Sequence, residues 1–292
     1  LINAGGPWVS DIIHNVLRVN TPEKVRLVRG SHIVVPKIWD HGKCYFFQGN
    51  DGRIIFAIPY ETDFTLIGTT DIEHIELDEK PQCSELEKNY LINFANQYFD
   101  TELKVEDIVW TYSGVRPLQD TSEGNATAVT RDYSIKVNWE NDVPLINIFG
   151  GKITTYRKLS ESVLNEVAAF FPKMRGPWTA EAYLPGGDFP INGVSDLIMD
   201  LLNDYPFLNE KWAARLVKAY GREAFEMLGN ARNEDDLGIN FGATLTQKEV
   251  EWLIREEFAT SAEDILWRRS KLGLRMGALQ VKNLQNFIAS QT

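Results

Sequence analysis

The pattern of apolar and polar positions changes twice along this chain. The first twenty residues have the pattern of a strand end, a Gly-Gly-Pro turn and a short helix over Trp8–Leu17 with one apolar side. From about residue 25 to residue 143, alternating positions and short apolar runs predict strands. One helix interrupts them over Ser84–Tyr98, where Ser84 followed by Glu87 has the spacing of an N-terminal capping box.

The second change comes after residue 143. A buried strand over Leu145–Phe149 leads into a glycine turn and then into a helix that reaches about Phe171. The tripeptide Arg175-Gly176-Pro177 is typical of a linker. The remaining sequence has helical periodicity, which predicts helices over Ser195–Asn203, Glu210–Tyr220, Arg222–Leu228, Gln247–Glu257, Ser261–Ser270 and Arg275–Ser290.

These elements predict a mixed fold with α/β and α+β parts, because strands and helices do not alternate regularly. We expect residues 1–20 to end one α/β domain and residues 21–144 to form an inserted domain with an antiparallel sheet. Residues 145–176 would return to the first domain as a strand and a helix. Residues 177–292 would form an all-helical C-terminal domain.

Composition narrows the choice of partners. The chain has 292 residues, 43% of them hydrophobic, and a net charge of -11, which argues against a nucleic-acid partner. A local cluster can still bind one small anion. Cys44 and Cys83 lack metal-binding spacing, so we expect two reduced thiols in a cytoplasmic protein and no metal site. No stretch has the length of a membrane-spanning helix, and no signal peptide is recognisable.

The run FGGKITTYR at 149–157 is the first candidate site. Gly150 and Gly151 would permit a close backbone approach, and a helix N-terminus favours an anion. Lys152 adds a cation, and Thr154 or Thr155 adds a hydroxyl donor. The alternative is an ordinary strand-to-helix turn with a surface lysine.

Two arginines and a histidine are further candidates. Arg116, held between Val115 and Pro117, could present its guanidinium to a carboxylate, a phosphate or an oxyanion, or it could form a structural ion pair. Arg131 has the same two interpretations. His32 is either a satisfied core residue or a ligand contact, and Gly30 and Ser31 beside it favour the ligand.

The segment Thr69-Thr70-Asp71 ends a predicted strand in small polar residues. It could contact a ligand, or Asp71 could simply cap a turn.

Taken together in order, these runs resemble the FAD-dependent glycerol-3-phosphate dehydrogenases of the glycine/D-amino-acid oxidase-like flavoprotein superfamily. The resemblance runs through essentially the whole chain. The residues that carry it are NAGGPW at 3–8, GSHIVVP at 30–36, IGTTD at 67–71, WTYSGVRP at 110–117, TRDY at 130–133, FGGKITTYR at 149–157 and LPGG at 184–187.

The resemblance implies a partial FAD-binding, Rossmann-like domain with an inserted substrate domain, followed by the helical domain. It implies oxidation of sn-glycerol 3-phosphate to dihydroxyacetone phosphate, with electrons passed from FAD to a quinone. The implied location is the cytoplasm, with peripheral attachment at the inner face of the membrane, and a homodimer is a possible assembly. The implied cofactor-binding residues are Ala4, Gly5, Gly6, Trp8, Gly150, Gly151, Lys152, Ile153 and Thr154.

The resemblance also implies roles in catalysis. Arg116 would stabilise the oxygen at the reacting carbon, and Arg131 would bind the substrate phosphate. Lys152 and Thr154 would also contact the substrate. His32 or Lys152 would act as the general base, and the sequence does not rank these two.

One departure separates the chain from the family pattern. The G-x-G-x-x-G fingerprint that grips the FAD pyrophosphate does not occur here, and Gly5-Gly6 has a different spacing. We therefore expect that this chain lacks the family's N-terminal segment, and that this segment of the same protein is the partner it needs to hold FAD. The alternative to an active enzyme is a folded, inactive fragment that does not hold FAD by itself.

Overall fold

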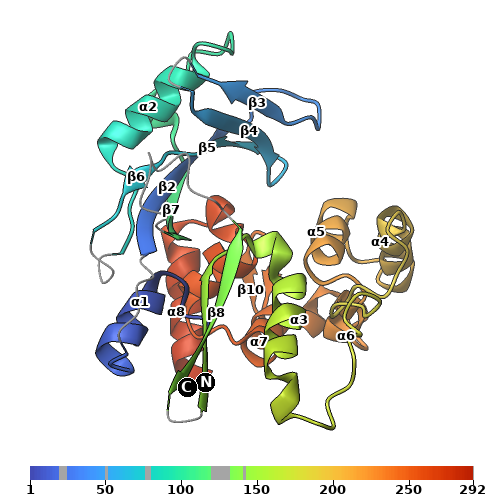
Figure 1. Ribbon diagram of the computed structural model, residues 1–292. Coiled ribbons are helices and arrows are strands. Elements are labelled where there is room, and N and C mark those ends of the chain that lie inside the picture. The colour runs from blue at the N-terminus through green and yellow to red at the C-terminus, as the bar shows by residue number, and fades with distance from the viewer. Residues whose placement is uncertain (20–24, 50–51, 76–79, 120–131, 141–142, 292) are drawn as a thin grey trace. The chain divides into compact units, whose positions relative to one another are not determined.

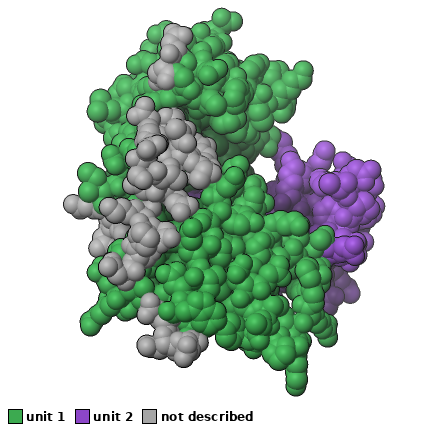
Figure 2. All heavy atoms as spheres, in the orientation of Figure 1, with its two compact units in different colours: residues 1–180 green, residues 181–292 purple. Residues whose placement is uncertain are grey.

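The computed structural model describes residues 1–19, 25–49, 52–75, 80–119, 132–140 and 143–291 (Figure 1). The chain divides into two compact units, Leu1–Ala180 and Glu181–Thr292, which are coloured separately in Figure 2. Each unit is described by itself. None of the helices in the described ranges combines the length and apolar character that crossing a lipid bilayer requires.

A six-stranded antiparallel sheet in the first unit is built around one long strand, β2 (Val25–Pro36). Strand β7 (Trp110–Gln119) pairs with one edge of β2 along ten residues. The other edge pairs with β5 (Phe64–Gly68) and then with β6 (Ile72–Glu73). Strands β4 (Ile54–Tyr60) and β3 (Tyr45–Gln48) extend the sheet beyond β5.

Helix α2 (Glu85–Ala95) packs on one face of this sheet, as Figure 1 shows. The predicted capping box is confirmed, because the Ser84 hydroxyl accepts from the Glu87 amide and the Glu87 carboxylate accepts from the Ser84 amide. The buried core between helix and sheet includes Ile33, Val35, Ile55, Ile67, Leu91 and Phe94. The opposite face of β2 and β7 is therefore left for other contacts.

A smaller sheet contains β1 (Ile2–Asn3), β9 (Val143–Gly150) and β8 (Tyr133–Glu140) in that order. Strands β1 and β9 are parallel, and β8 is antiparallel to β9. Because side chains alternate along a strand, β9 buries residues on both faces.

Each face of this sheet has its own helical layer. Phe149 packs with Val9 and Ile13, which belong to a short helical stretch made of η1 (Gly6–Trp8), α1 (Val9–Asp11) and the π-helical turn Ile12–Val16. On the other face, Ile146 packs with Val163 and Val167 of helix α3 (Tyr156–Val167).

The second unit is mainly helical. Its α-helices are α4 (Val194–Asp204), α5 (Glu210–Tyr220), α6 (Glu223–Leu228), α7 (Gln247–Glu257) and α8 (Ala278–Gln291). The stretch predicted as a helix over Ser261–Ser270 contains a π-helical segment, Asp264–Arg269. A short antiparallel pair, β10 (Asn240–Gly242) with β11 (Leu245–Thr246), is an addition to the predicted helices.

Candidate active site

The two predicted residues His32 and Arg116 lie on the same face of the large sheet. Strand pairing places His32 opposite Tyr112, Gly30 opposite Gly114, and residue 28 opposite Arg116. Directly paired residues in an antiparallel ladder project to the same side, and residues two apart along a strand do so as well. This face is opposite the one that α2 covers, because Ile33 and Val35 alternate with His32.

His32 lies between a tyrosine ring and a glycine. Its imidazole stacks on Tyr112 with the ring centroids 4.8 Å apart and the planes 7° from parallel. A Cβ at Gly68 would collide with the imidazole, so only glycine fits at this position of β5. The Nδ1 atom of His32 is buried and has no hydrogen-bond partner among the described residues.

His32 is uncharged at neutral pH. Burial removes water from the imidazole and is the larger cause, and the positive charge of Arg116 adds to it; together they lower the pKa of His32 from 6.5 to about 4. A neutral imidazole has a lone pair that can accept a proton.

Arg116 is fixed by a segment of three residues. Its Nη1 atom donates to Asp71 Oδ1 at 2.7 Å and to the Thr70 carbonyl at 3.4 Å, and its Nη2 atom donates to Thr69 Oγ1 at 2.9 Å. A Cβ at Gly30 would overlap the guanidinium, so the arginine lies flat against the backbone of β2. Arg116 therefore forms the structural ion pair that was one of its two interpretations in the sequence, and its acidic partner is Asp71.

The sequence offered two roles for Thr69-Thr70-Asp71, and the contact with Arg116 is a third. This segment connects β5 to β6 along the edge of β2. Thr69 and Asp71 face Arg116, whereas the Thr70 hydroxyl accepts from the Ser31 amide at 2.9 Å.

The two glycine runs lie at the same edge of the smaller sheet. Asn3 pairs with Asn147 in parallel register, so Gly5-Gly6, which follow β1, and Gly150-Gly151, which begin at the last residue of β9, both lie at the carboxyl ends of parallel strands. In open α/β sheets this edge is where ligands bind. Strand β7, which carries Arg116, contacts both β9 and η1.

The second glycine run has the backbone freedom that the sequence predicts. Gly150 has φ +66° and Gly151 has φ +102°, a region that other residues rarely enter. A Cβ at Gly150 would lie 3.0 Å from the carbonyl oxygen of Asp132, so this turn approaches neighbouring backbone closely.

The helix after these glycines begins later than predicted. A single 3₁₀ turn, η4 (Ile153–Thr155), precedes α3, and Lys152 is its N-cap residue. The Thr155 hydroxyl donates to the Lys152 carbonyl at 2.8 Å, so it is used within the turn, whereas Thr154 is exposed. Lys152 Nζ lies 3.9 Å from Asp132 Oδ1, and both side chains are exposed.

Three observations show that these residues are compatible with a bound FAD. Glycines with positive φ occur at the edge of the smaller sheet, where a large ligand needs close backbone approach. The exposed side chains of Trp8, Ile153 and Thr154 lie in the same two runs. The buried Nδ1 atom of His32 and the fixed guanidinium of Arg116 provide polar groups on the face of β2 and β7.

Arg131, the predicted phosphate ligand, lies outside the described residues. Its neighbour Asp132 is exposed and precedes β8. The role of Arg131 therefore stays a prediction.

Two buried polar groups near the site were not singled out as functional in the sequence. The side chain of Asn3 donates to Asn147 Oδ1 at 3.0 Å and to the Val9 carbonyl at 3.1 Å, tying β1, β9 and the first helical stretch together. Glu87 is 2% exposed and accepts hydrogen bonds from several hydroxyl groups. Its position in a capping box was the signal available, but that pattern indicates a helix start and not a link to a site.

Comparison with known proteins finds two family matches and several similar dehydrogenases. The family described as FAD dependent oxidoreductase matches residues 1–138, and the C-terminal domain of alpha-glycerophosphate oxidase matches residues 177–289. The chain is 42% identical to a glycerol-3-phosphate dehydrogenase from Pseudomonas aeruginosa, over 100% of this chain and 57% of that protein. It is 40% identical to the aerobic glycerol-3-phosphate dehydrogenase of Escherichia coli, over 100% and 58%.

A third relative has a different name. The chain is 42% identical to a D-erythritol 1-phosphate dehydrogenase from Brucella abortus, over 93% of this chain and 54% of that protein. The chain thus spans somewhat more than half the length of these curated relatives.

A solved structure supports the fold. The glycerol-3-phosphate dehydrogenase from Bacillus halodurans, complexed with FAD, superposes with a TM-score of 0.76 and 22% identity, over 99% of this chain and 61% of that chain. The predicted fold class, a Rossmann-like part with an inserted sheet followed by a helical C-terminal domain, is confirmed. The chain therefore combines an FAD dependent oxidoreductase domain with a C-terminal domain of the alpha-glycerophosphate oxidase type, and it is homologous to the aerobic glycerol-3-phosphate dehydrogenases.

Proposed function

We propose that this chain carries the substrate-oxidising part of an enzyme that converts sn-glycerol 3-phosphate to dihydroxyacetone phosphate. The observation that supports it most is that a neutral imidazole, His32, and a fixed guanidinium, Arg116, lie on the same face of the large sheet. In this proposal residues 21–144 bind the substrate, residues 1–20 and 145–176 face the flavin, and residues 177–292 form the helical domain.

The chemistry requires the loss of a proton and a hydride from a secondary alcohol. FAD, when bound, supplies the two-electron acceptor for the hydride. His32 would accept the hydroxyl proton at a ring nitrogen. Arg116 would stabilise the negative charge that grows on the oxygen as the proton leaves, and loss of such a donor typically costs roughly 3–4 kcal/mol in the transition state.

The other predicted residues complete this arrangement. Lys152 is the alternative base, or an electrostatic partner of the substrate, and Thr154 would add a hydroxyl donor. Ala4, Gly5, Gly6 and Trp8 would hold the cofactor from one side, and Gly150, Gly151, Lys152, Ile153 and Thr154 from the other.

Arg131 would bind the substrate phosphate, for which a bidentate guanidinium is better suited than an ammonium group. Arg131→Lys should raise the KM for substrate far more than it lowers kcat. A collapse of kcat with unchanged substrate binding would show that Arg131 does not anchor the phosphate.

The direct test of the proposal is anaerobic flavin reduction. The flavin-loaded protein is mixed with sn-glycerol 3-phosphate, and the loss of visible flavin absorbance is followed. Bleaching at a rate compatible with turnover supports the proposal, and bleaching that stays at the rate of a substrate-free control contradicts it.

D-erythritol 1-phosphate is the second candidate substrate, because a relative of that name is as similar to this chain as the first glycerol-3-phosphate dehydrogenase. The same experiment with this ester separates the two. The substrate with the higher kcat/KM for flavin reduction is the one to which the site is adapted.

The competing proposal is that the chain is an inactive fragment. The visible absorbance of bound flavin distinguishes the two proposals. Purified protein that shows no flavin absorbance after incubation with excess FAD and gel filtration would favour a folded fragment that does not hold FAD by itself. Sedimentation of the same sample tests the proposed homodimer.

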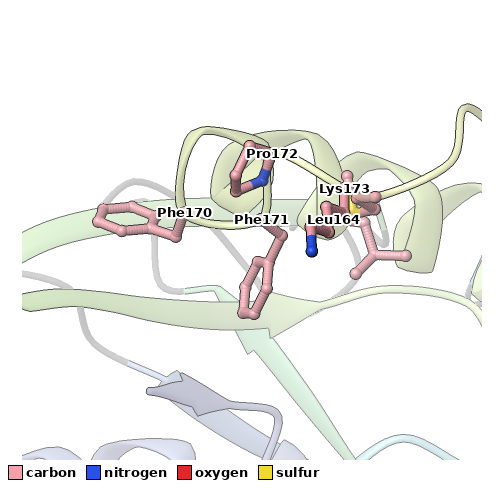
Figure 3. Close-up of a pocket in the computed structure, with 6 residues that line it drawn as sticks. Leu164, Phe170, Phe171, Pro172 and Lys173 are labelled. Carbon is pink, nitrogen blue, oxygen red and sulfur yellow. The ribbon is translucent and has the colours of Figure 1, made fainter.

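A quinone as the final acceptor and a peripheral membrane attachment complete the proposal. Their support is an apolar hollow of about 540 Å³ just after α3, lined by Leu164, Phe170, Phe171, Pro172, Lys173 and Met174. In Figure 3 the side chains of Phe170, Phe171 and Pro172 project from the turn that follows the helix. Exposed aromatic residues beside a lysine are typical of a surface that enters the lipid interface.

This attachment is tested by co-sedimentation with vesicles of anionic and neutral lipids. Phe171→Asp should weaken vesicle binding strongly, whereas Ile191→Asp, at an apolar position that is 99% exposed in the second unit, should leave it unchanged. Equal loss in both variants would indicate that Phe171 has no special role.

A further inference from the structure

Glu87 is a buried carboxylate on the side of the large sheet that faces away from His32 and Arg116. Its side chain is 1% exposed. Oε1 accepts from the hydroxyl groups of Ser31 and Thr70, each at 2.7 Å, and Oε2 accepts from Arg29 Nη2 at 3.0 Å and from the Ser84 amide and hydroxyl. Burial alone raises the pKa of Glu87, but these hydrogen bonds outweigh burial and lower it below its usual value.

Thr70 connects this carboxylate to the site. Its hydroxyl donates to Glu87 and accepts from the Ser31 amide at 2.9 Å, so both sides of the hydroxyl are fixed. The residues on either side of Thr70 hold Arg116: Thr69 Oγ1 accepts from Nη2, and Asp71 Oδ1 accepts from Nη1. The Thr70 carbonyl accepts from Nη1 as well.

We propose that Glu87 is a positioning residue for Arg116, which it holds in place through Thr70. The guanidinium depends on three consecutive residues between β5 and β6, and this segment has its buried side-chain anchor at Glu87. Because a buried carboxylate with five hydrogen bonds has little freedom to move, the segment keeps one conformation. The expected effect of Arg116 on the reaction rests on the proposed function, whereas the link from Glu87 through Thr70 to Arg116 does not.

Glu87 has a second role that the test must separate from the first. It is the third residue of the capping box of α2, so replacing it would weaken the helix as well as the link to Thr70. The informative substitution is therefore Thr70→Val, which removes the hydroxyl and keeps the shape of the side chain. Thr70→Ser retains the hydroxyl. Ser84→Ala removes the helix cap and the hydroxyl contact of Ser84 with Glu87 Oε2, but it leaves the contact between Thr70 and Glu87 Oε1 in place.

The first readout does not need activity. Arg116 lowers the pKa of His32, so displacing the guanidinium should raise that pKa toward its ordinary value. The chain has four histidines, and NMR of ¹³C-labelled imidazole with His32→Gln as the assignment control measures this titration. We expect a higher pKa in Thr70→Val and the parental value in Thr70→Ser and Ser84→Ala.

The second readout is flavin reduction in the whole chain. Thr70→Val should slow it by roughly tenfold or more, with a smaller effect on KM, because mispositioned catalytic groups act mainly on the chemical step. A folded Thr70→Val protein with an unchanged His32 titration would overturn the proposal, as would Ser84→Ala with an equal change. If the unsubstituted protein does not reduce flavin, the proposed function fails, and the NMR titration still decides the proposal on Glu87.

Discussion

The guanidinium of Arg116 lies against the backbone of Gly30, in the space that a Cβ at residue 30 would take. The two residues are on neighbouring strands, and the residue paired with Gly30 is also a glycine, Gly114. The absence of a side chain at residue 30 thus allows a long arginine to lie along the sheet and reach Thr69 and Asp71.

The first prediction follows from this contact. Gly30→Ala should push the guanidinium away from Asp71 and slow flavin reduction by roughly 100-fold, since a small misplacement of a catalytic group has effects of that size. The melting temperature should change little, because the displaced atoms are the far end of a flexible side chain and alanine lowers the entropy of the unfolded chain.

Gly114→Ala is the matched control for this prediction. It lies on the paired position of β7, and a Cβ there would have no heavy atom within 4 Å in the described structure. Its flavin reduction should equal that of the parent. Equal rates for both alanine variants would show that the position of Arg116 does not limit the reaction.

The second prediction distinguishes the two candidate bases. If His32 is the base, its pKa of about 4 leaves the imidazole neutral, and the rate of flavin reduction should be flat between pH 6 and 8. His32→Gln should then lower the rate by roughly 10²–10⁴-fold.

If Lys152 is the base, a different dependence of the flavin-reduction rate on pH is expected. An ammonium group must lose its proton before it can act as a base, so a lysine base gives a rate that climbs with pH. Stopped-flow flavin reduction of His32→Gln and Lys152→Gln across this range measures both profiles. A near-normal rate in His32→Gln would transfer the role to Lys152.

The third prediction concerns stability in acid. The pKa of His32 is depressed on folding, so between pH 6.5 and about 4 the unfolded chain binds a proton that the folded chain does not. The free energy of unfolding should therefore fall as the pH drops through this window. Urea unfolding at a series of pH values, followed by near-UV circular dichroism, measures the slope.

His32→Gln provides the comparison, because it removes the titrating group and should flatten this part of the pH dependence. A further loss below the usual pKa of a glutamate is expected in both proteins, since Glu87 has a lowered pKa in the folded state and must take up a proton as the pH falls. An identical slope in parent and variant above pH 4.5 would contradict the assignment to His32.

The fourth prediction concerns the second unit. Glu249 is 1% exposed and forms two hydrogen bonds with Arg215, at 2.6 and 2.7 Å, and one with the Tyr220 hydroxyl. Glu249→Ala leaves a largely buried guanidinium without its acid, so it should lower the free energy of unfolding by about 3–5 kcal/mol. Thermal unfolding of the whole chain measures this.

An exposed ion pair is the control for that substitution. Arg255 and Glu256 lie 2.6 Å apart, but both side chains are at least 46% exposed. Water and ions screen such a pair, so Glu256→Ala should change stability by less than about 1 kcal/mol. A similar loss in both variants would mean that burial does not decide the outcome.

The sequence predicted the parts of the fold that depend on local pattern. Helices Glu210–Tyr220 and Gln247–Glu257 have the predicted bounds, because their apolar periodicity and end signals agree. The region predicted to contain strands begins with one long strand, β2 (Val25–Pro36), in which Gly30 keeps its place in the ladder opposite Gly114.

The candidate site was predictable only in part. His32, Arg116 and Gly150 could be singled out because residue type and flanking residues carry a signal. The roles of Asp71, Thr69 and Glu87 depend on contacts between segments far apart in the sequence, which a local pattern does not contain. The assignments of catalytic and binding roles remain predictions that the experiments above test.

The long strand β2 makes the site unusually sensitive to one class of genetic change. Its alternate residues serve opposite sides of the sheet: His32 belongs to the candidate site, and Ser31 is hydrogen-bonded to Glu87 on the other side. A point substitution alters one of these contacts, but deleting or inserting a single codon within Val25–Pro36 would exchange the two sides for every residue beyond it. Variation in this strand should therefore be limited to substitutions, and length changes should be confined to the connections outside it.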